Sequence, residues 1–203
     1  MTTPDYSFEE ACSKSPVCGI DEAGRGPWAG PVVASAVILN AADIPEGLND
    51  SKKLTAKRRD ALFDAINEAA QVGVGIATVQ EIDEINILQA TFLAMRRAVD
   101  ALPNQPAYAL IDGNKVPPDL ICEAEAIVKG DGRSVSIAAA SIIAKVTRDR
   151  ITVTLAHQFP GYGWERNAGY GVKAHQKGLH RLGVTPHHRV SLKPIHKLLH
   201  LEN

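Results

Sequence analysis

Carboxylate side chains occur at three places in the sequence where an apolar or glycine-rich run ends. Asp21 and Glu22 directly follow one apolar run, Asp112 ends another, and Asp131 lies between two glycines. Carboxylate oxygens are the ligands that hard divalent cations prefer. If the two apolar runs are neighbouring strands, Asp21 and Asp112 converge. This pattern therefore predicts a divalent-metal site.

A Gly-Arg-Gly sequence follows the first two acids closely, as Gly24, Arg25 and Gly26. Glycine lets a backbone approach a ligand closely, and arginine binds phosphate. Carboxylates beside such a segment indicate metal-assisted chemistry on a phosphodiester. A dinucleotide-binding fingerprint does not fit, because Pro27 and Pro31 disfavour a helix at this point.

The charges divide unevenly along a chain whose net charge is only −1. Residues 1–112 hold 9 Lys and Arg against 16 Asp and Glu, whereas residues 113–203 hold 13 against 7 and all 7 histidines. A basic C-terminal half is compatible with nucleic acid, since phosphate affinity depends on local positive potential. A mixed solvated surface would give the same counts, so charge alone leaves both interpretations open.

The composition is typical of a globular protein of one domain. The 203 residues and their 45% hydrophobic content are enough for a core. The first 16 residues are too polar for a signal peptide, and no apolar run approaches the roughly 18 residues of a membrane span. The three cysteines lack metal-ligand spacing. We therefore expect a cytoplasmic protein with reduced thiols and no membrane contact, and a monomer.

The apolar and β-branched runs predict five strands, at 17–21, 32–39, 72–79, 107–112 and 124–129. Helices are expected at about 55–70, 87–102 and 134–157, with Thr55 and Asn86 as caps of the first two. This order is typical of an α/β domain with a mixed central sheet flanked by helices. From residue 159 the sequence predicts a small region of loops and short helices packed onto the same single domain, 1–203.

Four polar side chains outside the acidic set are candidates for positioning phosphates. Ser141, Lys145 and Arg148 are spaced four and three apart on the long predicted helix, so they can face a common ligand. Lys52 lies in a polar loop. Phosphate contacts orient a strand without reading its bases. Solvated surface positions would show the same residue types, so this remains a hypothesis.

Five segments together resemble ribonuclease HII, the bacterial type 2 ribonuclease H. They are GIDEAGRGPWAGPVVASAVIL (19–39), NDSKKLT (49–55), IDGN (111–114), KGDGRSVSIAAASIIAKVTRDR (129–150) and GYGVKAH (169–175). The resemblance implies an RNase H-like fold. It also implies an endoribonuclease that hydrolyses the RNA strand of RNA/DNA hybrids and nicks 5′ of single ribonucleotides in duplex DNA. Two Mg²⁺ or Mn²⁺ ions would assist, leaving 3′-hydroxyl and 5′-phosphate ends.

The resemblance also implies a role for individual residues. The four metal-binding carboxylates map onto Asp21, Glu22, Asp112 and Asp131. The Gly-Arg-Gly segment would read the ribose 2′-hydroxyl, and Tyr170 would sense the RNA–DNA junction from a substrate-contacting region at about 159–203. The sequence departs from the family at Val172, where Thr is frequent, and at Leu192, where Phe is common. Neither change removes a proposed catalytic group.

Other functions fit parts of the sequence. A metal-dependent phosphatase or a nuclease of another substrate class would also use clustered acids, although the Gly-Arg-Gly segment disfavours it. An inactive nucleic-acid-binding module would not need all four carboxylates. A zinc site is a further alternative, but its candidate ligands lack the usual spacing: His187, His188, His196 and His200.

Overall fold

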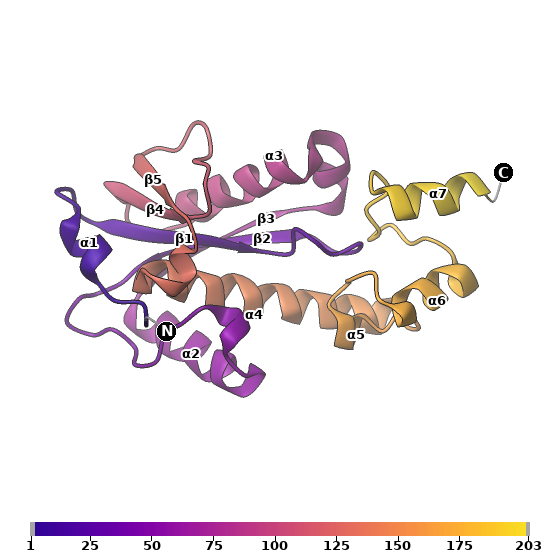
Figure 1. The fold of residues 1–203 in the computed structure, drawn as a ribbon, viewed down its shortest axis with the longest axis horizontal. Helices are drawn as coiled ribbons and strands as arrows, with labels where there is room; N and C mark the ends of the chain where they lie inside the picture. Colours follow the sequence, from indigo (N-terminus) through magenta and orange to yellow (C-terminus); the bar gives the residue numbers. More distant parts are fainter. Residues whose placement is uncertain (1–2, 202–203) are drawn as a thin grey trace.

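A single five-stranded sheet forms the centre of the protein in the computed structural model, which describes residues 3–201 (Figure 1). The strand order is β3-β2-β1-β4-β5. β1 pairs with β2, and β2 with β3, in antiparallel register, whereas β1–β4 and β4–β5 are parallel. The strands are β1 (Val17–Ala23), β2 (Val32–Ile38), β3 (Gln71–Ala77), β4 (Tyr108–Asp112) and β5 (Glu123–Ile127).

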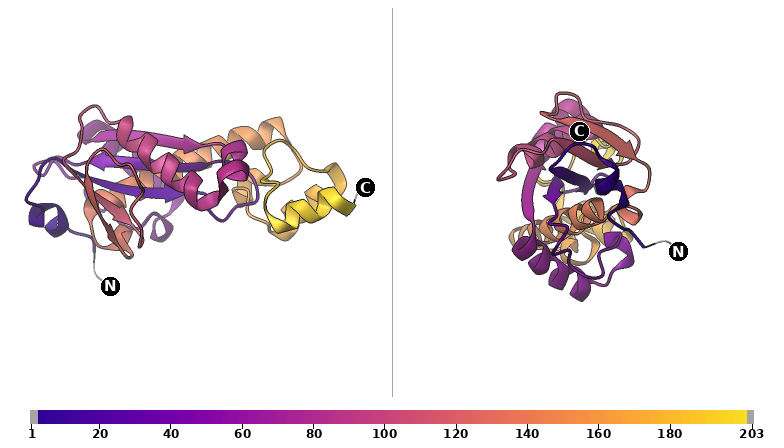
Figure 2. Two further views of the ribbon diagram at one scale, coloured as in Figure 1. Left: turned by 90° about the horizontal axis from the view of Figure 1, so that it is seen from above. Right: turned by 90° about the vertical axis from the view of Figure 1, so that its left-hand side faces the viewer.

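Helices cover both faces of the sheet (Figures 1 and 2). α3 (Val79–Asp100) packs on one face, and α2 (Ala56–Ala69) and α4 (Val135–Gln158) pack on the other. Because both faces are covered, all seven residues of β2 are buried. The predicted α/β class, with a mixed sheet flanked by helices, is confirmed.

The beginning of α3 differs from the sequence prediction, which placed a strand as far as residue 79. The strand β3 ends at Ala77, and Thr78 and Glu81 form a capping box that begins the helix at Val79. The predicted cap at Asn86 exists, at a kink inside α3. There Asn86 has a φ of 68°, and its Oδ1 accepts hydrogen bonds from the backbone N–H groups of Leu88 and Gln89.

The N-terminal half of α4 is buried on nearly every side and lies directly against β1. Ser134 caps this helix, as its hydroxyl accepts from the N–H of Ile137. Glu9, in the short helix α1 (Ser7–Ala11), accepts from the N–H of Ser136 at 3.0 Å. A carboxylate at this end of a helix is favourable, because the unpaired N–H groups there carry a partial positive charge.

Three further helices follow α4 and extend beyond the end of the sheet (Figure 1). They are α5 (Trp164–Asn167), α6 (Lys173–Leu182) and α7 (Lys193–Leu201). Tyr162, Trp164, Leu179 and Ile195 are buried together and form the core of this C-terminal region. Among residues 3–201, no helix is long and apolar enough to span a membrane.

We predict that Gly19→Ala destabilises the fold by about 3 kcal/mol or more, because an added methyl group overpacks the β1–α4 contact. A Cβ at this position would lie 2.1 Å from the carbonyl carbon of Ser136. Urea unfolding measures the effect. Gly132→Ala is the control, since its Cβ would approach only Lys53 Nζ, at 3.5 Å. Equal unfolding midpoints for the two variants would show that β1 and α4 do not need this close contact.

Candidate active site

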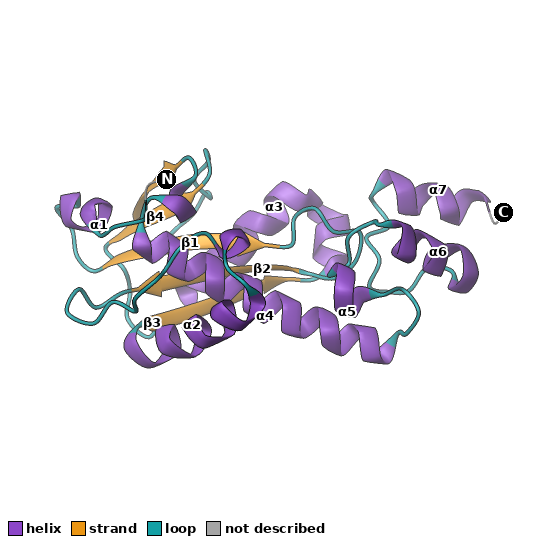
Figure 3. Cartoon of the chain, turned by 60° about the horizontal axis from the view of Figure 1, so that its bottom comes forward, coloured by secondary structure: helices purple, strands orange, loops and turns teal. Residues whose placement is uncertain are grey.

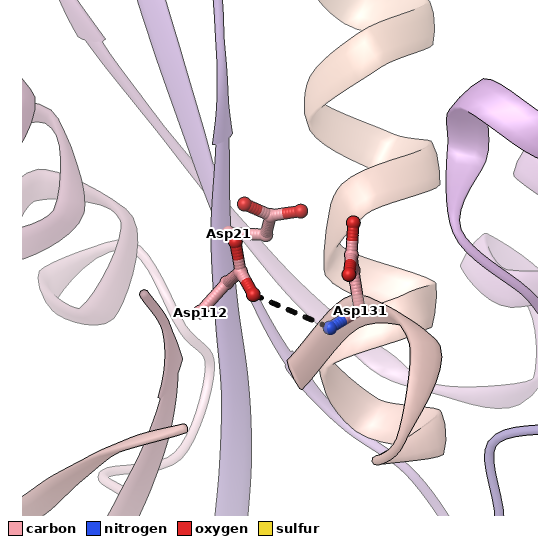
Figure 4. Close-up of side chains that lie close together, drawn as sticks. All are labelled: Asp21, Asp112 and Asp131. Atoms are coloured by element: carbon pink, nitrogen blue, oxygen red, sulfur yellow. Dashed lines mark hydrogen bonds between the residues drawn. The ribbon is translucent and has the colours of Figure 1, made fainter. Parts of the chain in front are cut away.

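Three aspartates from separate parts of the sequence meet at the end of the central strands (Figure 4). Asp21 lies in β1, Asp112 ends β4, and Asp131 lies in a 3₁₀ turn, η2 (Gly130–Gly132). Each offers a carboxylate oxygen within 4.8 Å of the other two. The predicted convergence of Asp21 and Asp112 is therefore confirmed, and Asp131 joins them.

The parallel pairing of β1 with β4 explains why the first two carboxylates meet. Ile20 is paired with Ile111, so Asp21 and Asp112 follow at the same level of adjacent strands. Adjacent parallel strands lie about 4.8 Å apart, and residues at the same level point to the same side. The register of one strand pair thus places two carboxylates side by side.

The side chain of Asp112 positions the turn that carries the third carboxylate, Asp131. Asp112 Oδ1 accepts a hydrogen bond from the N–H of Gly130 at 2.7 Å. It also accepts from the N–H of Asp131 at 3.4 Å (Figure 4). Lys129 has a left-handed backbone, with a φ of 57°, and leads the chain into this turn. One oxygen of Asp112 therefore positions η2, and with it the Asp131 side chain.

Burial and mutual repulsion oppose the ionisation of this cluster. The pKa of Asp21 is raised well above its usual value, chiefly by burial and then by the charges of Glu22 and Asp112. Burial and the Asp112 charge likewise raise the pKa of Asp131. Lys52 offsets part of this charge, with its Nζ 4.0 Å from Asp131 Oδ2.

The donor set fits a hard divalent cation. Closely spaced, buried carboxylate oxygens bind Mg²⁺ or Mn²⁺ and gain a counter-charge in doing so. The group contains no histidine, and within the described residues it is the one set with metal-ligand spacing. The zinc alternative therefore gains no support, although the side chain of His200 lies outside the described residues.

Glu22, the fourth predicted ligand, is not part of the aspartate cluster. Its carboxylate is close enough to raise the pKa of Asp21, but it lies outside the set of oxygens that meet within 4.8 Å. Its Oε1 accepts from Arg25 Nη1 at 3.3 Å. Burial raises the pKa of Glu22, while the Arg25 charge lowers it. Glu22 still lines the cleft beside the aspartates, so its role as a ligand stays a prediction.

The Gly-Arg-Gly segment and Tyr170 line the same cleft as Asp21. The cleft has a volume of about 250 Å³. Tyr170 is 48% exposed, and a Cβ on Gly26 would lie 3.2 Å from its ring. A second hollow of about 190 Å³ continues past Glu22 and Asp112 to Asn114 and Lys115, which the sequence analysis did not single out.

The four predicted phosphate-positioning residues separate into two groups. Lys52 and Lys145 line the cleft, and the ammonium group of Lys145 is paired with Asp149 at 2.8 Å. Ser141 is buried, and its hydroxyl accepts from the N–H of Ser51, next to Lys52. Ser141 thus supports the turn that carries Lys52.

Arg148 is only 1% exposed, although the sequence pattern placed it facing a ligand. Its guanidinium donates to the carbonyl oxygens of Ala29, Pro31 and Ala168, at 3.0 to 3.1 Å. These bonds satisfy its three nitrogens. Arg148 also lines the cleft, but its nitrogens are engaged by backbone carbonyls, so its direct contact with a phosphate stays a prediction.

Arg189 was missed by the sequence analysis, yet it contacts the Gly-Arg-Gly segment directly. It donates to the carbonyl oxygens of Gly24 and Arg25, at 2.5 and 2.9 Å. The loop after β1 runs toward the C-terminal helices (Figure 3), and Ala29 forms an isolated β-bridge with His188. The only sequence signal for this contact was an arginine directly after two histidines.

Two buried histidines connect Tyr170 to the C-terminal core. His175 Nδ1 lies 3.0 Å from the carbonyl oxygen of Tyr170, and its Nε2 accepts from the Trp164 indole and faces His188 Nε2, also at 3.0 Å. His188 Nδ1 accepts from the N–H of Thr185. Two neutral rings fit these contacts, with the His188 proton on Nε2, where it shares the single lone pair of His175 Nε2 with the Trp164 N–H.

A mixed sheet of this order, with carboxylates at the ends of its central strands, defines an RNase H-like fold with the ligands for divalent metal. The model of the family "Ribonuclease HII" matches residues 18–200. The chain therefore belongs to the ribonuclease HII family. It is a metal-dependent endonuclease that acts on the RNA strand of RNA/DNA hybrids.

Individual relatives agree with this assignment. The ribonuclease HII of Ruegeria pomeroyi is 60% identical over 205 residues, covering 100% of this chain and 88% of the relative. The crystal structure of ribonuclease H2 from Pyrococcus horikoshii superimposes with a TM-score of 0.76 at 28% identity, covering 91% of this chain and 97% of that one. RNase HII of Archaeoglobus fulgidus, solved in complex with PCNA, gives 0.71 at 27% identity, covering 87% and 95%.

We predict that Asp21→Asn abolishes hydrolysis and leaves the fold intact. The change removes one metal-ligand charge, and it also removes repulsion from Asp112, so the melting temperature in EDTA should not fall. Turnover in Mg²⁺ and thermal melting in EDTA measure the two effects. Asp43→Asn, at an exposed position, is the control. Wild-type turnover in purified Asp21→Asn would rule out the aspartate cluster as the catalytic centre.

We predict that the protein loses stability as the pH falls from about 6.5 toward 4. Burial lowers the pKa of His188 to about 4, with a smaller contribution from His175. In the unfolded chain, His188 has its ordinary pKa of 6.5, so it binds a proton at a higher pH than in the folded protein. This difference lowers the free energy of unfolding by on the order of 2 kcal/mol at pH 5.

Denaturant unfolding at pH 7 and pH 5 measures this loss in the wild type. His188→Gln should show a smaller pH dependence, whereas His157→Gln, at an exposed position, should behave as the wild type does. If all three proteins lose the same free energy of unfolding between the two pH values, the neutral histidine pair is not the cause.

Proposed function

We propose that the protein nicks duplex DNA on the 5′ side of a single embedded ribonucleotide, in addition to cutting the RNA strand of hybrids. The observation that carries the proposal is that one cleft brings together Asp21, the Gly-Arg-Gly segment and Tyr170. Carboxylates for the chemistry thus lie beside groups that can distinguish ribose from deoxyribose.

The aspartates hold divalent metal in this proposal. Asp21, Asp112 and Asp131 supply carboxylate oxygens, and Glu22 adds its own from the neighbouring position on β1. Two Mg²⁺ or Mn²⁺ ions bound there would activate the attacking water and neutralise the departing 3′ oxygen. The products would carry 3′-hydroxyl and 5′-phosphate ends.

The Gly-Arg-Gly segment recognises the ribose. The 2′-hydroxyl is the group that distinguishes RNA from DNA at one nucleotide. Gly24 and Gly26 lack side chains, so their backbone can approach this hydroxyl, while the exposed Arg25 can bind the adjacent phosphate. At Gly24 no side chain fits, since a Cβ would lie 2.0 Å from Arg148 Nε.

Tyr170 senses the deoxyribose that follows the ribonucleotide. Its ring is exposed beside Gly26, and a 2′-hydroxyl on the second sugar would crowd it. Lys52 and Lys145 position the backbone phosphates. For Ser141 and Arg148 we now propose an indirect role, because Ser141 supports the Lys52 turn and Arg148 supports the loop after β1.

We further propose that residues 1–203 act as one domain, in which the region at about 159–203 contacts the substrate through Tyr170. The protein acts as a cytoplasmic monomer on hybrids and on DNA that contains ribonucleotides.

The test of this function is cleavage of a DNA duplex with one ribonucleotide in Mg²⁺, with an all-DNA duplex and EDTA as controls. We expect one nick, 5′ of the ribonucleotide, and no cleavage of either control. Cleavage of the all-DNA duplex, or cleavage in EDTA, would contradict the proposal.

We predict that Tyr170→Ala slows the nick at a single ribonucleotide by at least about tenfold more than it slows cleavage of a long hybrid. The reason is that a long hybrid does not require a deoxyribose at the tyrosine. Initial rates on the two substrates measure the ratio. Tyr170→Phe, which keeps the ring, is the matched control and should retain the wild-type ratio.

A melting curve completes this experiment. If Tyr170 merely packs the C-terminal region, Tyr170→Ala loses stability and both substrates slow equally. That result would contradict the role of the tyrosine at the junction.

A further inference from the structure

Arg189 is a buried arginine whose guanidinium donates hydrogen bonds to backbone carbonyl oxygens alone. It is 1% exposed. Its Nη2 and Nη1 donate to Gly24 and Arg25, and its Nε donates to Gly30 at 3.0 Å. The guanidinium therefore joins the beginning of the loop after β1 to its end, because it binds carbonyl groups from both.

The direction of these carbonyls fixes the direction of the neighbouring N–H groups. In a planar trans peptide, the C=O of one residue and the N–H of the next point in opposite directions. Because the carbonyls of Gly24 and Arg25 point inward to Arg189, the N–H groups of Arg25 and Gly26 point outward. Both residues line the cleft beside Asp21.

These outward N–H groups have no partner within the protein. Across residues 3–201, the backbone N–H groups of Gly24, Arg25 and Gly26 donate no hydrogen bond. Consecutive free N–H groups form a concave donor site that suits an oxygen acceptor. A ribose hydroxyl in the cleft can accept from such donors.

Stability alone does not explain a buried arginine here. Burial, and then the nearby charge of Arg148, lower the pKa of Arg189 to about 9, so its charge is held at a cost. Asp83 in α3 accepts hydrogen bonds from the N–H groups of Val190 and Ser191, at 3.1 and 2.9 Å. These bonds hold the residues that directly follow Arg189. A lysine could not reach the same carbonyls, because only the planar fork presents donors in several fixed directions.

We propose that Arg189 is a positioning residue for recognition of the 2′-hydroxyl: it holds the Gly24 and Arg25 carbonyls inward and so presents the N–H groups of Arg25 and Gly26 to the ribose. This proposal rests on the proposed function and names a residue that sets its specificity. Arg189 itself touches neither the substrate nor the metal ligands.

The test measures the wild type and a variant on two duplexes that differ only in the group at the 2′ position. One duplex carries a single ribonucleotide, and a second carries a 2′-fluoro nucleotide at that position, which is a poor acceptor for an N–H group. The wild type should prefer the ribonucleotide. In Arg189→Met we expect kcat/KM for the ribonucleotide to fall by about tenfold more than kcat/KM for the 2′-fluoro duplex, the effect of one or two lost hydrogen bonds.

A second variant and a control complete the test. Arg189→Lys retains the positive charge but not the planar guanidinium, so it should show the same loss of preference. It replaces Arg189→Met if that variant does not fold. Arg166→Met removes an arginine whose side chain is 90% exposed, and it should keep the wild-type preference. Calorimetric titration with Mn²⁺ should give the same affinity for the wild type and Arg189→Lys, since the aspartates are not moved.

The outcomes separate the inference from the function on which it rests. If the wild type does not cut the ribonucleotide duplex, the proposed function fails and the inference fails with it. If the wild type cuts, but folded Arg189→Lys slows on both duplexes equally, then Arg189 only stabilises the fold and the inference alone is overturned.

Discussion

The parallel pairing of β1 with β4 is the constraint on which the site depends. It brings Asp21 and Asp112 to the same level of adjacent strands, in a place where burial already opposes their charge. Such a pair is unfavourable without a cation, so the rest of the protein has to keep these strands in register. α4 does so by packing directly on β1, where Gly19 lets the helix backbone approach, and Glu9 and Ser134 stabilise the beginning of that helix.

The C-terminal region completes the site from the other side. Its aromatic core and the paired histidines hold Tyr170, and Arg189 binds the carbonyls of the Gly-Arg-Gly segment. The aspartates are therefore positioned by the sheet, whereas the groups that we propose face the ribose are positioned by the contact between the loop after β1 and residues 169–189. In the proposed function, catalysis and discrimination of the sugar thus rest on different parts of the fold.

The sequence predicted most of the sheet and the aspartates, because strand-terminal acids and apolar, β-branched runs are local patterns. The capping box of Thr78 and Glu81 is a local pattern too, but Val79 also continues an apolar run, and this run predicts a longer strand. Arg148 was assigned to a ligand because helical spacing shows which residues share a stripe but not which loop covers it. Arg189 contacts Gly30, 159 residues away in the sequence, and the His175–His188 contact depends on how the C-terminal helices pack, so residue spacing predicts neither.

The central claim is that the aspartates hold divalent metal that would activate water to hydrolyse the phosphodiester, while the 2′-hydroxyl is recognised and does not react. The most direct test is mass spectrometry of the products from a duplex with one ribonucleotide, cut by the wild type in Mg²⁺. The account predicts a DNA fragment ending in 3′-hydroxyl and a second fragment that begins with 5′-phosphate on the ribonucleotide. A 2′,3′-cyclic phosphate, or a cut on the 3′ side of the ribonucleotide, would contradict it.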